Sequence, residues 1–281
     1  MTPFAQIPLE RSEYIEQAYL YELLEARIIQ QVPIQELLEQ VRLEIAANTR
    51  LPLAIDFLLT ELKHSGTMAP AMRRLGHYFT PFQTYLVEEA EADRGKFDMR
   101  VALKILRCEV TYRAEGGTCE GLFFFQFEAI CRNRLRYDPG LTAIGADPGY
   151  PPTWKAFIHK LNRELGLVDL ADLIFLHSDH YREQLLARGD SLERRGPFLL
   201  GSQEGRIAVA CRRRDPLYLF GALQRHLGYP AVPRVQPPDR TLEVIPQILR
   251  KLEQLEQRLK LMEQENQSGI DITRYYGRTP D

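Results

Sequence analysis

The sequence predicts a mainly α-helical protein with a small α+β part. We expect an N-terminal helical bundle, a domain with a small three-stranded mixed or antiparallel sheet, and a C-terminal coiled-coil helix. Three observations predict this fold class. Apolar residues recur at helical spacing as far as Arg136, short segments near residue 200 have strand-like composition, and residues 242–265 repeat a heptad pattern. A chain of 281 residues is long enough for one large domain or two ordinary ones.

Composition and charge exclude several functional classes. The formal net charge of −2 gives no overall attraction to nucleic acid or to an anionic membrane surface. No apolar stretch approaches the roughly 20 residues that span a bilayer, and the N-terminus lacks the basic and apolar regions of a secretory signal. The four cysteines are scattered without a short pair, which favours reduced thiols over a disulfide framework or a zinc site. We therefore expect a cytoplasmic protein without a membrane partner.

The helices of the N-terminal region are predicted from residues that start helices. Each start has either a side-chain oxygen that can cap the N-terminus or a proline suited to the first turn. Six helices with short links fit an antiparallel bundle or stacked helical pairs, and no fixed repeat of 30–45 residues is visible. The expected starts are Ser12, Pro33, Pro52, Thr80, Asp98 and Thr118, with a less regular short helix from Pro70.

The sixth of these helices, over residues 121–136, is predicted to be the buried centre of the region. It contains four phenylalanines within five residues, and its first half is apolar almost all round, which is typical of a buried helix. A buried strand over residues 122–127 is the alternative, because short apolar runs fit both structures. The helix is favoured because the apolar spacing continues to Leu135 and because Glu128 and Arg132 form an i,i+4 pair.

A Pro- and Gly-rich stretch, residues 137–152, predicts a turn-rich connection between two domains, residues 1–149 and 150–235. In the second domain we expect helices over residues 154–165 and 216–227.

The three predicted strands also belong to the second domain. Residues 173–176 are typical of a short buried strand. Residues 198–201 and 206–211 are typical of two strands joined in a hairpin through residues 202–205. Together they predict the small sheet.

Residues 236–266 combine a linker with the most regular pattern in the chain, and a tail follows over residues 267–281. In a parallel dimer, Lys251 would face Glu256 of the partner and Arg258 would face Glu263, so both cross-pairs are attractive. The alternative is a terminal helix that packs on its own domain. The predicted dimer interface consists of Ile245, Leu252 and Leu259 at position a and Ile248, Leu255 and Met262 at position d.

Several carboxylates lie on apolar stripes of the predicted N-terminal helices and are candidates for a metal site. They are Glu22, Glu61 and Glu89, and His64 follows Glu61 at a spacing that places both on one helix face. Glutamates from several helices with a Glu-x-x-His motif resemble the ligand pattern of ferritin-like di-metal carboxylate proteins. That pattern needs two such motifs and this chain offers one, so pairing of the glutamates with Arg or Lys is the alternative.

Two arginine clusters are candidates for a basic patch that binds nucleic acid. The near-neutral chain and the absence of a nucleic-acid-binding motif argue that they are ordinary solvated faces or ion-pair partners. The clusters are Arg132, Arg134 and Arg136, and Arg212, Arg213 and Arg214.

Residues 177–180, His-Ser-Asp-His, have catalytic residue types, but Ser178 or Asp179 as a helix cap is the better interpretation.

The function we expect is that of a non-enzymatic interaction or scaffolding protein that homodimerises through residues 242–265 and binds a further protein partner. The reason is a clear association element in a chain without a complete catalytic constellation. The first alternative is a metal-dependent helical-bundle enzyme with a divalent or di-metal centre. A weaker alternative is association with nucleic acid through the arginine clusters.

Overall fold

The computed structural model describes residues 9–29, 32–45, 49–92, 97–191 and 196–234. These residues form thirteen helices and contain no β-strand, so the mainly α-helical prediction is confirmed and the predicted three-stranded sheet is wrong. None of these helices is long and apolar enough to cross a membrane. The helices are α1 Arg11–Ile28, α2 Ile34–Glu44, α3 Leu51–Ser65, α4 Ala69–Arg74, α5 Pro81–Glu91, α6 Met99–Ala114, α7 Cys119–Arg132, α8 Tyr137–Gly145, α9 Pro152–Glu164, α10 Leu170–Leu176, α11 Asp179–Arg188, α12 Ser202–Ala210 and α13 Pro216–Leu227.

The first predicted strand, residues 173–176, is the second half of α10. Leu173 and Ile174 are buried, and a short apolar run fits a buried strand and a buried helix equally well. The side chain of Asp169 accepts a hydrogen bond from the backbone N–H of Ala171 and caps the N-terminus of α10. This cap favours the helix, because it satisfies a backbone donor that a helix start leaves without a partner.

The predicted hairpin over residues 198–211 is also wrong. Leu200 pairs with Ser178 in an isolated bridge, and residues 202–210 form α12 in place of a turn and a second strand. Gly205 lies where a Cβ atom would come within 2.2 Å of Ser178 Oγ. The glycine therefore allows α12 to pack closely against the start of α11, whereas its sequence context suggested a turn.

Helix α8 replaces most of the turn-rich connection predicted over residues 137–152. Pro139 lies in the first turn of α8, where its missing N–H costs no helical hydrogen bond. A Cβ atom at Gly140 would lie 2.6 Å from Ile130 Cδ1 and 3.1 Å from the ring of Tyr85. The Pro-Gly pair that is typical of a turn thus starts a helix and lets it approach α7 and α5.

Several helices begin and end where the sequence predicts. Thr80, Asp98 and Thr118 each accept a hydrogen bond from a backbone N–H in the first turn of α5, α6 and α7, respectively. The Thr80 cap is reciprocal, because the side chain of Gln83 accepts a hydrogen bond from the Thr80 N–H. Gly66, with φ of 74°, ends α3 in the left-handed conformation.

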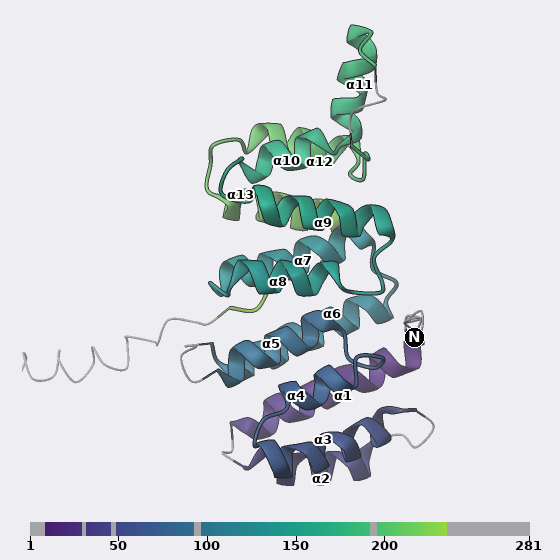
Figure 1. Ribbon diagram of the computed structural model, residues 1–281, viewed down its shortest axis with the longest axis vertical. Coiled ribbons are helices and arrows are strands. Elements are labelled where there is room, and N and C mark those ends of the chain that lie inside the picture. The colour runs from purple at the N-terminus through teal and green to yellow at the C-terminus, as the bar shows by residue number, and fades with distance from the viewer. Residues whose placement is uncertain (1–8, 30–31, 46–48, 93–96, 192–195, 235–281) are drawn as a thin grey trace, which may run out of the picture. The chain divides into compact units, whose positions relative to one another are not determined.

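Figure 1 shows the helices of residues 9–234 stacked in layers, with α2 and α3 at one end and α10, α11 and α12 at the other. Helix α1 packs along α6, α5 contacts α6 and α8, and α8 contacts α9. Helix α13 returns to pack on α7, so segments far apart in the sequence lie side by side. The layers match the stacked helical pairs, one of the two expected arrangements. Residues 9–234 belong to one compact unit, and a domain boundary near residue 150 stays a prediction.

Helix α7 is the buried helix that its phenylalanines predict, and the strand alternative is wrong. All ten residues from Gly121 to Ile130 are buried. The ring of Phe123 lies 5.5 Å from Trp154 and 5.8 Å from Phe157 on α9, and Phe127 meets Phe220 of α13 edge to face at 5.6 Å. Aromatic pairs in these geometries attract one another beyond the burial of their surfaces. They join α7 to α9 and α13.

A buried polar network lies beside this aromatic core. Glu109 of α6 has no exposed surface, and its carboxylate accepts hydrogen bonds from Arg113 at 2.8 and 3.1 Å. It also accepts one from Gln126 of α7 at 2.8 Å and one from Gln83 of α5 at 3.2 Å. Arg113 forms a second ion pair with Asp147 in the turn after α8. A single buried carboxylate therefore connects α5, α6 and α7, and through Arg113 the α8–α9 turn.

Two branches extend the network to further elements. The hydroxyl of Tyr150, before α9, donates to Gln126 Oε1 at 2.8 Å. On the other side, Gln83 donates to Gln17 of α1 at 3.4 Å, and Gln17 donates to the Tyr78 carbonyl at 3.2 Å. Burial raises the pKa of the Tyr150 hydroxyl well above its usual range, so Tyr150 is protonated and can donate near neutral pH.

We expect Glu109→Ala to lower the free energy of unfolding by about 3–5 kcal/mol, because it removes one of the two carboxylates that bind the buried Arg113 and the shared acceptor of two buried amide groups. Urea unfolding of the full chain measures this change. The matched control is Glu22→Ala, which removes a carboxylate that is 61% exposed and pairs with Arg107 at 3.6 Å, and should cost no more than about 1 kcal/mol. Equal losses for the two variants would contradict the structural role of Glu109.

Candidate binding pocket

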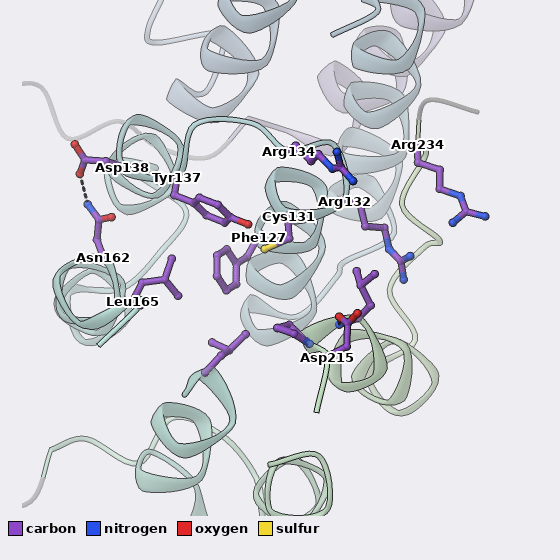
Figure 2. Close-up of a pocket in the computed structure, with 14 residues that line it drawn as sticks. Phe127, Cys131, Arg132, Arg134, Tyr137, Asp138, Asn162, Leu165, Asp215 and Arg234 are labelled. Atoms are coloured by element: carbon purple, nitrogen blue, oxygen red, sulfur yellow. Dashed lines mark hydrogen bonds between the residues drawn. The ribbon is translucent and has the colours of Figure 1, made fainter. Parts of the chain in front are cut away.

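A pocket of about 640 Å³ lies at the C-terminal end of α7. Figure 2 shows it between α8 and the end of α9 on one side and α13 on the other, with α7 behind. Pockets of about 300–1,000 Å³ are typical of ligand sites in proteins. Its lining divides into an apolar part and a charged edge.

The apolar part is built on successive turns of α7. Phe127 and Cys131 are four residues apart, so their side chains lie one above the other on the face of the helix that lines the pocket. Leu165, at the end of α9, and Leu170, the first residue of α10, complete this side. Phe127 is almost fully buried, so the inner wall is fixed by the core of the protein.

The thiol of Cys131 and the hydroxyl of Tyr137 meet inside the pocket, where Figure 2 shows the tyrosine directed toward the cysteine. Burial raises the pKa of Cys131 to about 12, although the hydrogen bond with Tyr137 opposes the change. Burial likewise raises the pKa of Tyr137 to about 12. Both groups are protonated near neutral pH, and a protonated thiol is a poor nucleophile. Cys131 therefore serves as a lining group.

Three arginines form the charged edge of the pocket. Arg132 donates from Nε to the buried carboxylate of Glu128. Arg134 has φ of 54°, a left-handed conformation that ends α7 and is uncommon outside glycine. The side chains of Arg134 and Arg234 are exposed and have no ion-pair partner within the described part of the chain. Two positive charges are thus available at the pocket edge.

The two carboxylates that line the pocket are already engaged. Asp138 accepts a hydrogen bond from the Asn162 side chain at 2.7 Å, drawn as the dashed line in Figure 2. Asp215 accepts one from the Leu217 backbone N–H at 2.9 Å and caps α13. Neither aspartate forms an ion pair with the arginines in the described residues, so the charge at the edge is not neutralised from within the pocket.

The segment after α13 is held against α7 and supplies Arg234. The Tyr229 hydroxyl lies 2.7 Å from Glu128 Oε2, so Glu128 binds both Tyr229 and Arg132. Asn133 donates from its side chain to the Pro233 carbonyl at 3.1 Å, next to Arg234 in the chain. These contacts place residues from the end of α7 and from the end of the described chain around the same opening. The arrangement can hold a ligand that has an apolar part and a negative charge.

The four predicted metal ligands lie on three helices, and the three glutamates pair with arginines. Glu22 on α1 lies 3.6 Å from Arg107, Glu61 on α3 lies 2.7 Å from Arg74, and Glu89 on α5 lies 2.5 Å from Arg136. His64, on α3, is exposed. Within the described residues, no group of three or more His, Cys, Asp or Glu side chains could hold a metal ion. Pairing of these glutamates with Arg or Lys is the alternative given in the sequence analysis.

Of the six arginines in the predicted basic patch, three are ion-paired. Arg132 binds Glu128 and Arg136 binds Glu89. Arg212 binds Asp172 at 2.7 Å and lies over the ring of Phe175 at 4.6 Å. Arg134 lines the pocket, and Arg213 and Arg214 are exposed and form no ion pair within the part of the chain that the structure describes. The predicted dimer residues Ile245, Ile248, Leu252, Leu255, Leu259 and Met262 lie outside the described residues.

Residues 177–180 have a structural role around the start of α11. The Ser178 hydroxyl accepts a hydrogen bond from the Tyr181 backbone N–H and caps α11, so the predicted helix cap is confirmed. His177 is buried against Phe157, and its Nδ1 lies 2.9 Å from the Leu173 carbonyl. Burial lowers the pKa of His177, and the nearby Lys160 lowers it further. His177 therefore packs in the core as a neutral ring.

Comparison with known proteins identifies no relative. No family model matches the chain, and neither a curated protein nor a solved structure does. The function is therefore argued from the pocket and from the sequence.

We expect Cys131 to react with iodoacetamide at least a hundredfold more slowly at pH 8 in the folded chain than in urea. A pKa of about 12 leaves on the order of 10⁻⁴ of the thiol as thiolate at this pH, whereas a free cysteine is about a quarter ionised. Mass-spectrometric mapping of the alkylated peptide measures the rate, and the urea-unfolded chain is the control. Equal rates in the two states would show that the pocket wall is open to solvent.

We expect His177→Asn to lose less stability than the wild-type chain as the pH falls from 7.5 to 5.5. Because burial lowers the folded-state pKa of His177 below its unfolded value, protons bind preferentially to the unfolded chain, and stability falls as the pH passes below the unfolded pKa. The charged groups that act on the ring are Lys160 and Glu164. The test is urea unfolding at each pH. A stability difference between the two chains that stays constant with pH would contradict the prediction.

Proposed function

We propose that this chain is a non-enzymatic interaction or scaffolding protein that holds a partner at the pocket beside α7 and homodimerises through residues 242–265. The observation that supports it best is a pair of arginines at the edge of an apolar cavity, Arg134 and Arg234, which have no ion-pair partner among the described residues. Such a combination of an apolar wall and a few oriented polar groups is typical of binding sites.

The state of the other pocket groups favours binding over catalysis. Cys131 is held protonated, Asp138 is engaged by Asn162, and Asp215 caps α13. A general base or a nucleophile needs a pKa suited to its task and a free path to the reacting atom. The groups that face this cavity instead fix its walls.

The heptad pattern supports the homodimer. It starts at Ile245, shortly after Arg234 in the sequence, so the partner pocket and the dimer helix are joined by a short Pro-containing linker. Lys251 and Arg258 face glutamates of the opposite helix in a parallel dimer, which favours that register. The four cysteines are free thiols, which agrees with a proposed place in the reducing cytoplasm.

We expect the full chain to have twice its 32.5 kDa monomer mass in size-exclusion chromatography with light scattering. Leu255→Lys, at a core d position, should give a monomer because it buries a charge between the helices. Gln257→Lys adds the same charge at the outward f position and should leave the dimer intact. A chain that ends at residue 238 should be monomeric. A monomeric full chain would refute the dimer.

A further inference from the structure

We infer that the pocket beside α7 binds a peptide segment of a partner protein in which an acidic side chain stands close to an aromatic or aliphatic one. The inference rests on the proposed interaction function and specifies the chemistry of the partner. It is drawn from the charge at the pocket edge, the apolar surface around the mouth, and the way the lining is held.

The charge at the pocket edge selects an anion. Arg134 and Arg234 have no ion-pair partner among the described residues, and Arg132 binds Glu128 through Nε alone in the hydrogen bonds of this site. The outer guanidinium nitrogens of Arg132 are therefore also available. A guanidinium presents a planar fork that matches a carboxylate with two parallel hydrogen bonds. A glutamate or aspartate side chain fits this edge.

Exposed apolar side chains adjoin two lining residues in the sequence, which favours a polypeptide over a small anion. Leu217 lines the pocket and is 41% exposed, and its neighbour Tyr218 on α13 is 70% exposed. Across the opening, Gly166 lines the pocket and the next residue, Leu167, is 84% exposed. Exposed large apolar side chains near a cavity with a polar edge are typical of protein-binding sites. A small ligand would leave them uncovered.

The lining is held in place before any partner binds. Phe127 and Cys131 project from the buried helix α7, and the left-handed backbone at Arg134 turns the chain at the end of that helix. Asn133 binds the Pro233 carbonyl and so holds the residue before Arg234. A preformed site loses little conformational entropy on binding, so a short peptide can bind it with measurable affinity.

A selection of random peptides displayed on phage, carried out on the full chain, tests the inference. Phage that bind the double variant Arg134→Glu/Arg234→Glu are removed in each round. We expect the enriched sequences to carry Asp or Glu within two positions of Phe, Tyr, Trp or Leu. Both substituted side chains are exposed and unpaired, so the variant should fold, and its circular-dichroism melting curve verifies this.

The affinity of a fluorescein-labelled synthetic copy of the most enriched peptide is then measured by anisotropy. We expect its Kd to rise at least tenfold in the double variant and in Leu217→Asp. We also expect the wild-type Kd to rise with salt concentration, because salt screens a charged contact. The matched control is Arg206→Glu, which reverses an exposed arginine on α12 outside the pocket lining and should leave the Kd unchanged.

Two outcomes would overturn the inference, and they differ in what they mean for the proposed function. Enriched peptides that require the pocket but lack acidic residues would refute the stated chemistry and leave the interaction function standing. If no peptide depends on the pocket, both the peptide inference and the partner site fall, whereas the homodimer is tested separately by light scattering.

Discussion

The carboxylate of Glu109 accepts four hydrogen bonds in a core that leaves it no exposed surface. An ionised carboxylate without water is stable only if each of its partners stays within hydrogen-bond distance. Because the partners come from α5, α6 and α7, these helices cannot slide past one another without exposing a buried charge. Apolar packing alone allows such sliding at lower cost, so the network fixes the register in which the aromatic core packs.

The position of the pocket follows from this constraint. Gln126 of α7 belongs to the network, and Phe127, the next residue, already lines the pocket. Glu128, the residue after Phe127, holds Arg132 at the pocket edge and Tyr229 in the segment that leads to Arg234. Fixing α7 therefore fixes both the apolar wall and two of the arginines. A pocket whose lining residues are held by a buried helix can keep its geometry while its edge remains open to a ligand.

The sequence predicts the helical core well and the site poorly, for physical reasons. The first half of helix α7 is apolar almost all round and follows a capping threonine, Thr118, so its local pattern and its burial agree. The predicted strands fail because short apolar runs are ambiguous and because Gly205 serves close helix packing, a tertiary contact that no local pattern reveals. The prolines and glycines of residues 137–152 are misinterpreted for the same reason.

The pocket could not be predicted from the sequence, because its lining residues come from separate stretches of the chain. Arg134 belongs to a predicted basic cluster, yet nothing local distinguishes it from Arg136, which pairs with Glu89. Arg134 has no ion-pair partner among the described residues, and it differs from Arg136 in the side chains that the fold places near it. The buried carboxylate Glu109 lies in the helix predicted to start at Asp98, but the sequence does not reveal its partners on α5 and α7.

The claim that α7 is the fixed centre of the described residues is tested most directly by native-state hydrogen exchange of the full chain. We predict that the backbone amides of residues 123–130 are the slowest to exchange and open only with global unfolding, because every side chain there is buried. The reference is α11, in which Leu185 alone is buried and local opening should be fast. Exchange in α7 as fast as that in α11 would contradict the account.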